Sequence, residues 1–267
     1  MQMPPFGAAS SSWGKGEVLV LAASVSIFTM LSWGDQGYGD EIARGTLMTL
    51  QVSLFAYVVG FGIGLCGAVG KLAGGPAVRN IFNVYTTTVR AIPELVLILL
   101  LFYAGSDAVN AILTQFGAGS VQINGLAAGV AVLGFVQGAY QTEVLRAAIQ
   151  AIPIGQIEAA KAYGMSPFLR FRRIVLPSML PFAIPGLANL WLNATKDSAL
   201  ISVVGFSELA LTTKQAAGYI KYSQGNPLYL LIFYALTAAI YLSISLFSNQ
   251  IFGWLERRMR RGQQRPA

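Results

Sequence analysis

The most informative stretch of this chain is GQIEAAKAYGMSPFLRFRRIVLP, residues 155–177. It is too polar to span a membrane, yet its residues favour two short helices. The first is expected over Gly155–Tyr163, with Gly164 in the left-handed conformation that ends many helices. The second is expected to begin after Ser166 as its N-cap and to stop at Pro177. The stretch is therefore predicted to be a helical loop.

Long apolar runs lie on both sides of this loop. Hydrophobic residues make up 55% of the 267 residues and charged residues only 11%, whereas about a quarter of an ordinary soluble domain is charged. A bilayer core about 30 Å thick needs about 20 apolar residues in a helix. Six runs approach this pattern: Val18–Trp33, Thr46–Gly70, Tyr85–Ala104, Gly125–Thr142, Pro181–Phe206 and Pro227–Phe252. The sequence therefore predicts an all-α integral membrane protein.

The first run is short and allows two interpretations. Residues 18–33 are either an additional N-terminal transmembrane helix or the apolar region of a cleaved signal peptide. The single basic residue before the run and the lack of a clear small-residue cleavage site favour the uncleaved span. Residues 1–17 are expected to form an N-terminal tail.

The basic residues indicate how the chain is oriented. With six spans and a cytoplasmic N-terminus, most Lys and Arg residues fall in cytoplasmic segments, as the positive-inside rule requires. Residues 256–267 form a basic cytoplasmic tail, so both termini are expected in the cytoplasm. This orientation, together with contact with anionic membrane lipid, accounts for the net charge of +7. Nucleic acid is therefore not expected as a partner.

The composition excludes several kinds of active site. The chain has no histidine and a single cysteine, Cys66, so it has neither an intrachain disulfide nor a histidine base. Zinc and iron–sulfur sites need Cys and His clusters, so no metal site is expected. The sequence has no Gly-x-x-x-x-Gly-Lys-Ser/Thr phosphate loop, so ATP hydrolysis would need another subunit. The chain is therefore not predicted to be an enzyme.

The spacing within the loop resembles a transport family. Glu158-Ala-Ala, Gly164 after three further residues, and Ile174-Val-Leu-Pro after nine more are similar to the EAA loop of ABC-importer permeases. By this resemblance, residues 151–177 form a coupling loop whose first helix docks on a separate ATP-binding subunit. The simpler alternative is an ordinary amphipathic loop helix with a glycine cap. The residues that carry the motif are Glu158, Ala159, Ala160, Gly164, Ile174, Leu176 and Pro177.

Three other stretches narrow the resemblance to permeases for polar and basic amino acids. They are residues 85–95, 139–156 and 196–200, and the whole resemblance covers Gly45 to Arg258. It is closest to the histidine, lysine/arginine/ornithine and opine type. It implies a type I ABC-importer permease fold with five core transmembrane helices within residues 45–255, to which the N-terminal helix is an addition.

The resemblance also implies partners and a location. An ATP-binding cassette dimer, in which ATP and Mg²⁺ act, would drive transport, and no cofactor is expected on this chain. A second permease, either a paralogue or another copy, would complete the pathway. A periplasmic solute-binding protein would deliver the substrate to the complex in the bacterial inner membrane.

Some polar residues in or beside the predicted spans are candidates for the substrate pathway: Glu94, Glu143, Asp197 and Ser198. A charge at the bilayer centre costs about 2.5–3.5 kcal/mol on insertion scales, so these groups should face protein or water. A carboxylate suits a cationic amino acid. For Glu94 and Glu143, ion pairs with Arg90 and Arg146 are the favoured alternative. For Asp197 the pathway role is favoured.

Glycines four residues apart occur in two of the predicted spans. Gly60 and Gly64 form one pair, and Gly134 and Gly138 form the other. This spacing allows helix backbones to approach closely in a membrane. Glycine is also common in membrane helices, so composition alone explains this spacing equally well.

Together these features predict the permease subunit of an ATP-driven importer that works by alternating access. Two other classes compete with this interpretation. An ion-gradient-driven secondary amino acid transporter would explain the membrane carboxylates, but not the loop spacing, and no inverted repeat is evident. The missing histidine and the absence of a nucleophile–base set in the sequence argue against a membrane-embedded enzyme.

Overall fold

The computed structural model describes residues 32, 37–117, 124–224 and 228–260. All regular structure in these ranges is helical. The α-helices are α2 (Gly39–Ala73), α3 (Pro76–Ala91), α4 (Glu94–Gln115), α5 (Gly125–Gln150), α6 (Ile154–Ala162), α7 (Pro167–Arg170), α8 (Leu176–Asp197), α9 (Leu209–Gln224) and α10 (Leu228–Arg260). The expected N-terminal tail, 1–17, and all of the expected first span, 18–33, except Ser32 lie outside the described residues.

Four stretches of described helix are long and apolar enough to cross a membrane: Gly39–Ala73, Glu94–Gln115, Pro167–Val204 and Leu230–Met259. Three of them match predicted spans, and Glu94–Gln115 overlaps only the second half of the predicted span Tyr85–Ala104. Together they confirm the all-α membrane class. Helix α5 covers a fifth, Gly125–Thr142, but it is less apolar because it carries Gln137 and Gln141. Both glutamine side chains are buried by neighbouring helices, so α5 is the central helix and its polar groups are shielded from lipid.

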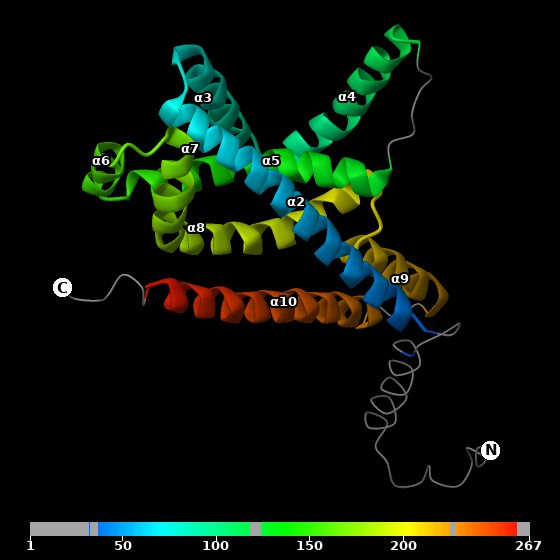
Figure 1. The fold of residues 1–267 in the computed structure, drawn as a ribbon. Coiled ribbons are helices and arrows are strands. Elements are labelled where there is room, and N and C mark those ends of the chain that lie inside the picture. The colour runs from blue at the N-terminus through cyan, green and yellow to red at the C-terminus, as the bar shows by residue number, and fades with distance from the viewer. Residues whose placement is uncertain (1–31, 33–36, 118–123, 225–227, 261–267) are drawn as a thin grey trace, which may run out of the picture.

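The centre of the fold is the crossing of α2 and α5 (Figure 1). A methyl group added to Gly60 would lie 3.1 Å from the carbonyl oxygen of Gly134, and one added to Gly64 would lie 2.8 Å from Cβ of Gln141. Larger side chains would therefore push the helices apart. The predicted close approach is confirmed, because Gly60 lies against Gly134 and Gly138 and Gly64 lies against the backbone of α5 one turn further along.

The expected span Tyr85–Ala104 is divided between two helices. α3 ends at Ala91, the backbone is extended at Ile92, and α4 begins at Glu94. The cause is Pro93, which has no N–H to donate and disfavours helical geometry in the residue before it. The break places the Glu94 carboxylate in the first turn of α4, where the helix dipole favours a negative charge.

Pro177 does not stop the second loop helix, so that expectation was wrong. The chain passes from α7 through a π-helical turn, Phe171–Val175, directly into α8. Pro177 lies in the first turn of α8. Proline has no N–H to donate, but at this position of a helix its absence costs few hydrogen bonds. Pro181 and Pro185 lie further along α8, which remains helical through both.

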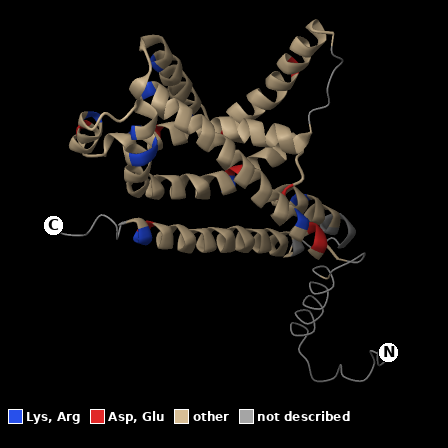
Figure 2. Ribbon diagram, in the orientation of Figure 1, with Lys and Arg blue, Asp and Glu red and all other residues tan. Residues whose placement is uncertain are grey.

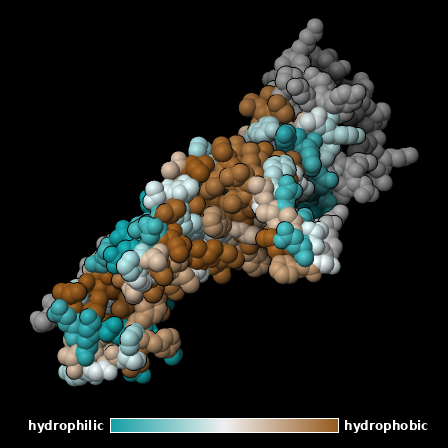
Figure 3. Space-filling view, turned by 90° about the horizontal axis from the view of Figure 1, so that it is seen from above, coloured by the Kyte–Doolittle hydropathy of each residue, from teal (hydrophilic) through white to brown (hydrophobic). Residues whose placement is uncertain are grey.

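Charged residues and hydrophobic residues lie in different parts of the molecule along its length. Many of the Lys and Arg residues lie on α6, α7 and the C-terminal end of α10 (Figure 2). Hydrophobic residues cover the middle of the face in Figure 3, with hydrophilic residues towards its ends. Residues 256–260 of the expected cytoplasmic tail continue α10. This distribution suits a protein whose middle lies in lipid and whose basic end lies in water.

Candidate functional site

The inner face of α6 holds the predicted coupling loop against the body of the protein. Ala160 is buried, and Ile157 packs against the core cluster formed by α2, α5 and α8. The Ser178 hydroxyl at the start of α8 donates a hydrogen bond to Oε1 of Gln156 at 3.0 Å. A movement of α6 would therefore be transmitted directly to α8.

The outer face of the same loop is exposed. Glu158 and Ala159 of the motif lie on this face. Exposed apolar and aromatic groups on a charged loop are typical of a docking surface. The spacing of Phe168, Phe171 and Val175 placed these residues on one side of the second loop helix, but the sequence did not predict that Phe168 is exposed. Three large side chains form this surface, and they are Ile154, Tyr163 and Phe168, with exposed fractions of 68%, 85% and 73%.

The turn after α6 has the geometry that the sequence predicts. Gly164 has φ +73°, and its N–H donates to the carbonyl oxygen of Lys161 at 2.9 Å. The N–H of Met165 donates to the carbonyl oxygen of Ala160 at 3.1 Å. The Ser166 side chain accepts a backbone N–H of α7, so both predicted caps are confirmed. The remaining motif residues, Ile174, Leu176 and Pro177, lie where α7 joins α8.

A second cluster lies where α3 gives way to α4. The carboxyl groups of Glu94, which begins α4, and Asp197, which ends α8, are close enough to interact directly. Nε2 of Gln137 donates a hydrogen bond to Oδ2 of Asp197 at 3.0 Å. The Arg90 guanidinium carbon lies 5.8 Å from the centre of the Tyr140 ring. Four helices thus meet around two carboxylates.

This cluster has unmet capacity for hydrogen bonding and charge. Gln137 is 1% exposed, and its Oε1 atom has no hydrogen-bond partner among the described residues. The carboxylates of Glu94 and Asp197 repel each other. The nearby cations Lys196 and Arg90 offset only part of this repulsion, because neither of them forms an ion pair with either acid in the described residues. Two carboxylates and a free carbonyl oxygen are acceptors suited to an ammonium or a guanidinium group.

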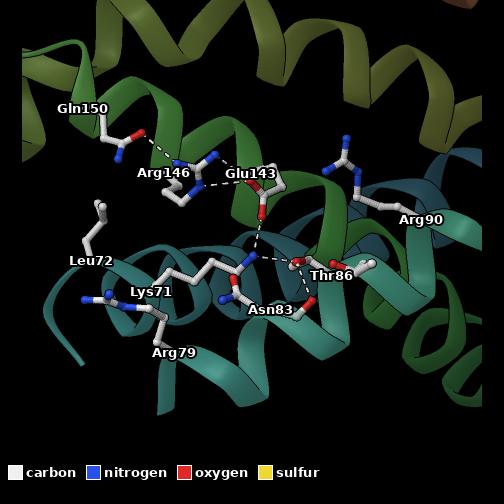
Figure 4. A pocket seen from close by; sticks show the side chains of 10 residues that line it. Lys71, Leu72, Arg79, Asn83, Thr86, Arg90, Glu143, Arg146 and Gln150 are labelled. Atoms are coloured by element: carbon white, nitrogen blue, oxygen red, sulfur yellow. Dashed lines mark hydrogen bonds and ion pairs between the residues drawn. The ribbon is translucent and has the colours of Figure 1, made fainter. Parts of the chain in front are cut away.

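Glu143 lies apart from this pair, at the end of α5 near the coupling loop (Figure 4). Its carboxylate forms ion pairs with Lys71 of α2 and, at 2.9 Å, with Arg146. The predicted pair with Arg146 is confirmed. Arg90 and Glu94, predicted as a similar pair, form no ion pair in the part of the chain that the structure describes. The reason is the helix break, which places them on different helices.

Ser198 lies in the protein interior and does not face an open pathway. It is buried, and its hydroxyl donates to the carbonyl oxygen of Thr195 at 2.7 Å. Ser198 therefore follows Asp197 in the chain without sharing its surroundings. The structure thus brings together two of the four pathway candidates, Glu94 and Asp197, and leaves Glu143 and Ser198 elsewhere.

Glu208 is an acidic residue outside the predicted coupling loop and the predicted substrate pathway. It is fully buried and caps α9 by accepting the backbone N–H groups of Ala210 and Leu211 at 2.8 and 3.0 Å. It also accepts the hydroxyl groups of Thr49 and Tyr241 at 3.0 and 2.9 Å. One carboxylate therefore joins α2, α9 and α10.

Comparison with known proteins agrees with this geometry. The family model described as "Binding-protein-dependent transport system inner membrane component" matches residues 46–261. The nopaline transport system permease protein NocQ of Agrobacterium fabrum is 42% identical, over 88% of this chain and 97% of the relative. The histidine/lysine/arginine/ornithine permease protein HisQ of Escherichia coli is 40% identical, over 86% of this chain and 97% of the relative.

A solved structure shows the same architecture. The crystal structure of an amino acid ABC transporter with histidines contains a chain that is 31% identical and superposes with a TM-score of 0.65. The match covers 83% of this chain and 95% of that one. The family model and these relatives do not support the secondary-transporter alternative. The chain belongs to the family of binding-protein-dependent transport system inner membrane components and is a membrane permease subunit of an ABC importer.

Proposed function

We propose that this chain forms half of the membrane pathway of an importer for cationic amino acids or opines. The observation that carries this proposal is the carboxylate pair, Glu94 and Asp197, beside the unpartnered carbonyl oxygen of Gln137. A guanidinium or ammonium group between the two acids would relieve their repulsion. The names of the relatives, which include lysine, arginine and nopaline, agree with such a substrate.

The break before α4 supports an amino-acid substrate in particular. The first turn of a helix leaves backbone N–H groups without intrahelical partners and carries a partial positive charge. Discontinuous helices serve in this way at the midplane of many transporters, where half-helix N-termini bind a substrate carboxylate. The backbone N–H groups at the start of α4 would thus bind the α-carboxylate, while the side chains of Glu94 and Asp197 together bind the cationic end.

The exposed face of α6 would couple this pathway to ATP. ATP and Mg²⁺ would act in a partner ATPase dimer, and Glu158, with the exposed aromatic groups beside it, would dock in a groove of one ATPase subunit. Closure of that dimer would move α6 and, through the contact of Gln156 with Ser178, also α8. A second permease, paralogue or copy, would complete the pathway, and a periplasmic binding protein would deliver the substrate. Both termini would lie in the cytoplasm.

Uptake of labelled arginine into proteoliposomes that contain the complete complex tests the substrate site. We expect Asp197→Asn and Glu94→Gln to raise the KM for uptake at least about tenfold, because each removes a charge-assisted contact worth about 1.5–3 kcal/mol. Asp107→Asn is the matched control, since Asp107 is an exposed carboxylate on α4 outside the cluster. If the KM stays unchanged in both cluster variants, these acids do not bind the substrate.

Co-purification of the ATPase tests the coupling surface separately. Glu158→Arg is expected to abolish ATPase retention and ATP-driven uptake, because it reverses the charge on the exposed face of α6. Glu41→Arg makes the same change at the opposite end of the molecule, on an exposed position of α2, and should retain both activities. Full ATPase retention and uptake in Glu158→Arg would remove α6 from the coupling mechanism.

A further inference from the structure

A pocket of about 530 Å³ lies where the ends of α2 and α5 meet α3 (Figure 4). It lies at the end of α5 that leads into the coupling loop, and it borders the acidic cluster at Arg90, which lines the pocket and also lies over the Tyr140 ring. Its lining is polar and contains neutral hydrogen-bond donors together with charged groups. The neutral polar residues are Asn83, Thr86, Thr87 and Gln150.

Positive charge predominates in this pocket. Lys71, Arg79, Arg90 and Arg146 line it, and Glu143 is its only acid. Glu143 accounts for two of the four cations, since it pairs with Lys71 and Arg146. Arg79 and Arg90 form no ion pair with any acid in the described ranges. The Arg90 guanidinium also lies beside the acidic cluster, so Arg79 is the guanidinium group that faces the pocket without a nearby carboxylate.

The positive-inside rule alone does not account for this arrangement. That rule predicts exposed Lys and Arg residues scattered over the cytoplasmic surface. Here Lys71 is only 9% exposed, and its amino group donates to Glu143 and to the Thr86 hydroxyl. Burying a charged amine is costly unless partners hold it in place. One wall of the pocket is therefore held in place by the contacts of Lys71 with Glu143 and Thr86.

Helix α3 indicates that the pocket lies at the level of the membrane surface. One side of α3 carries exposed apolar residues, and the opposite side carries the polar residues of the pocket. A helix with this division is typical of the boundary between lipid and water. The exposed apolar residues are Val78, Ile81 and Val84.

We propose that this pocket binds a phosphate-bearing anion, with Arg79 as its principal ligand. Guanidinium groups bind phosphate oxygens through paired charge-assisted hydrogen bonds. The same chemistry is offered by the headgroup of an anionic phospholipid and by free inorganic phosphate. A bound anion would hold α3 against α5 directly before the coupling loop, which begins only a few residues after Gln150. The proposal does not depend on which substrate is transported.

Native mass spectrometry of the delipidated complex tests the proposal. The probes are phosphatidylglycerol, phosphatidylcholine with the same acyl chains, and inorganic phosphate. We expect one saturable anion site per chain that binds phosphatidylglycerol or phosphate and does not bind the zwitterionic lipid. Arg79→Gln should weaken that binding about tenfold, as expected for the loss of one charge-assisted contact. Arg257→Gln, on an exposed position of α10 outside the pocket, should change it less than about twofold.

The probes separate the two sources of the anion. Saturable binding of phosphatidylglycerol without competition by phosphate assigns the pocket to lipid, and binding of phosphate alone assigns it to a free anion. Asn83→Asp is a second variant that adds a negative charge to the same wall, and it should weaken binding in the same direction. The proposal is overturned if neither anion binds selectively, or if Arg257→Gln weakens binding as much as Arg79→Gln.

Discussion

Replacing Glu208 by alanine should destabilise the packing of α9 against its neighbours. The Glu208 carboxylate is buried and accepts four hydrogen bonds, from the N–H groups of Ala210 and Leu211 and from the hydroxyls of Thr49 and Tyr241. The two hydroxyl groups can rotate towards other acceptors. The two backbone N–H groups are held by the helix and cannot.

The magnitude follows from those two backbone donors. Each buried donor left without an acceptor costs about 1–3 kcal/mol, so Glu208→Ala should lower the free energy of unfolding by about 2–6 kcal/mol. In a chain of this size, 1 kcal/mol corresponds to about 2–4 °C. The melting temperature should therefore fall by at least about 4 °C. Glu208→Gln keeps one carbonyl oxygen for the cap of α9 and should cost about 1 kcal/mol.

Thermal unfolding of the purified chain in detergent, followed by fluorescence-detected size-exclusion chromatography, measures this effect. Glu41→Ala is the matched control, because Glu41 is an exposed acid on α2 and its loss should leave the melting temperature unchanged. If Glu208→Ala has the same melting temperature as the wild-type protein, the carboxylate does not join α2, α9 and α10 as the structure indicates.

Three further changes test the packing, the loop and the ion pairs. Gly64→Leu should prevent stable folding or severely lower the yield of folded chain, because even a methyl group there would lie 2.8 Å from Cβ of Gln141. The yield of monodisperse protein after purification measures this effect. Gly164→Val should lower ATPase retention several-fold, because φ +73° strains a β-branched residue by about 1–2 kcal/mol. Glu143→Gln should lower the melting temperature by several degrees, since it leaves Lys71 nearly buried without its anion.

Matched variants decide whether these effects are specific. Gly62→Leu and Gly218→Val, the latter on α9 away from the coupling loop, are controls for the first two changes, because an added Cβ at either position meets no atom within 4 Å. Each should behave like the wild type, and an equal loss in a control and its partner would contradict the packing argument. Adding Lys71→Met to Glu143→Gln should recover part of the lost stability, because it removes the unpaired charge.

Local features were predictable from the sequence because they depend on neighbouring residues. The reversal at Gly164 and the N-cap at Ser166 follow from side-chain chemistry within a few residues. The break at Pro93 was equally local, yet the apolar run from Tyr85 to Ala104 suggested a single span. The error at Pro177 has a different cause, because the π-helical turn before it gives no composition signal.

Sequence by itself determined that this protein is helical, lies in a membrane, has its basic charge at one end and carries a loop suited to a partner ATPase. Hydropathy, charge and turn chemistry act on each segment separately, so they can be read without knowing the fold. Only the tertiary structure decided that Glu94 meets Asp197, that Glu143 pairs with Lys71, and that Glu208 is buried. Those outcomes depend on how helices far apart in the chain cross, and the spacing of glycines along one helix predicts close packing without specifying which helix packs there.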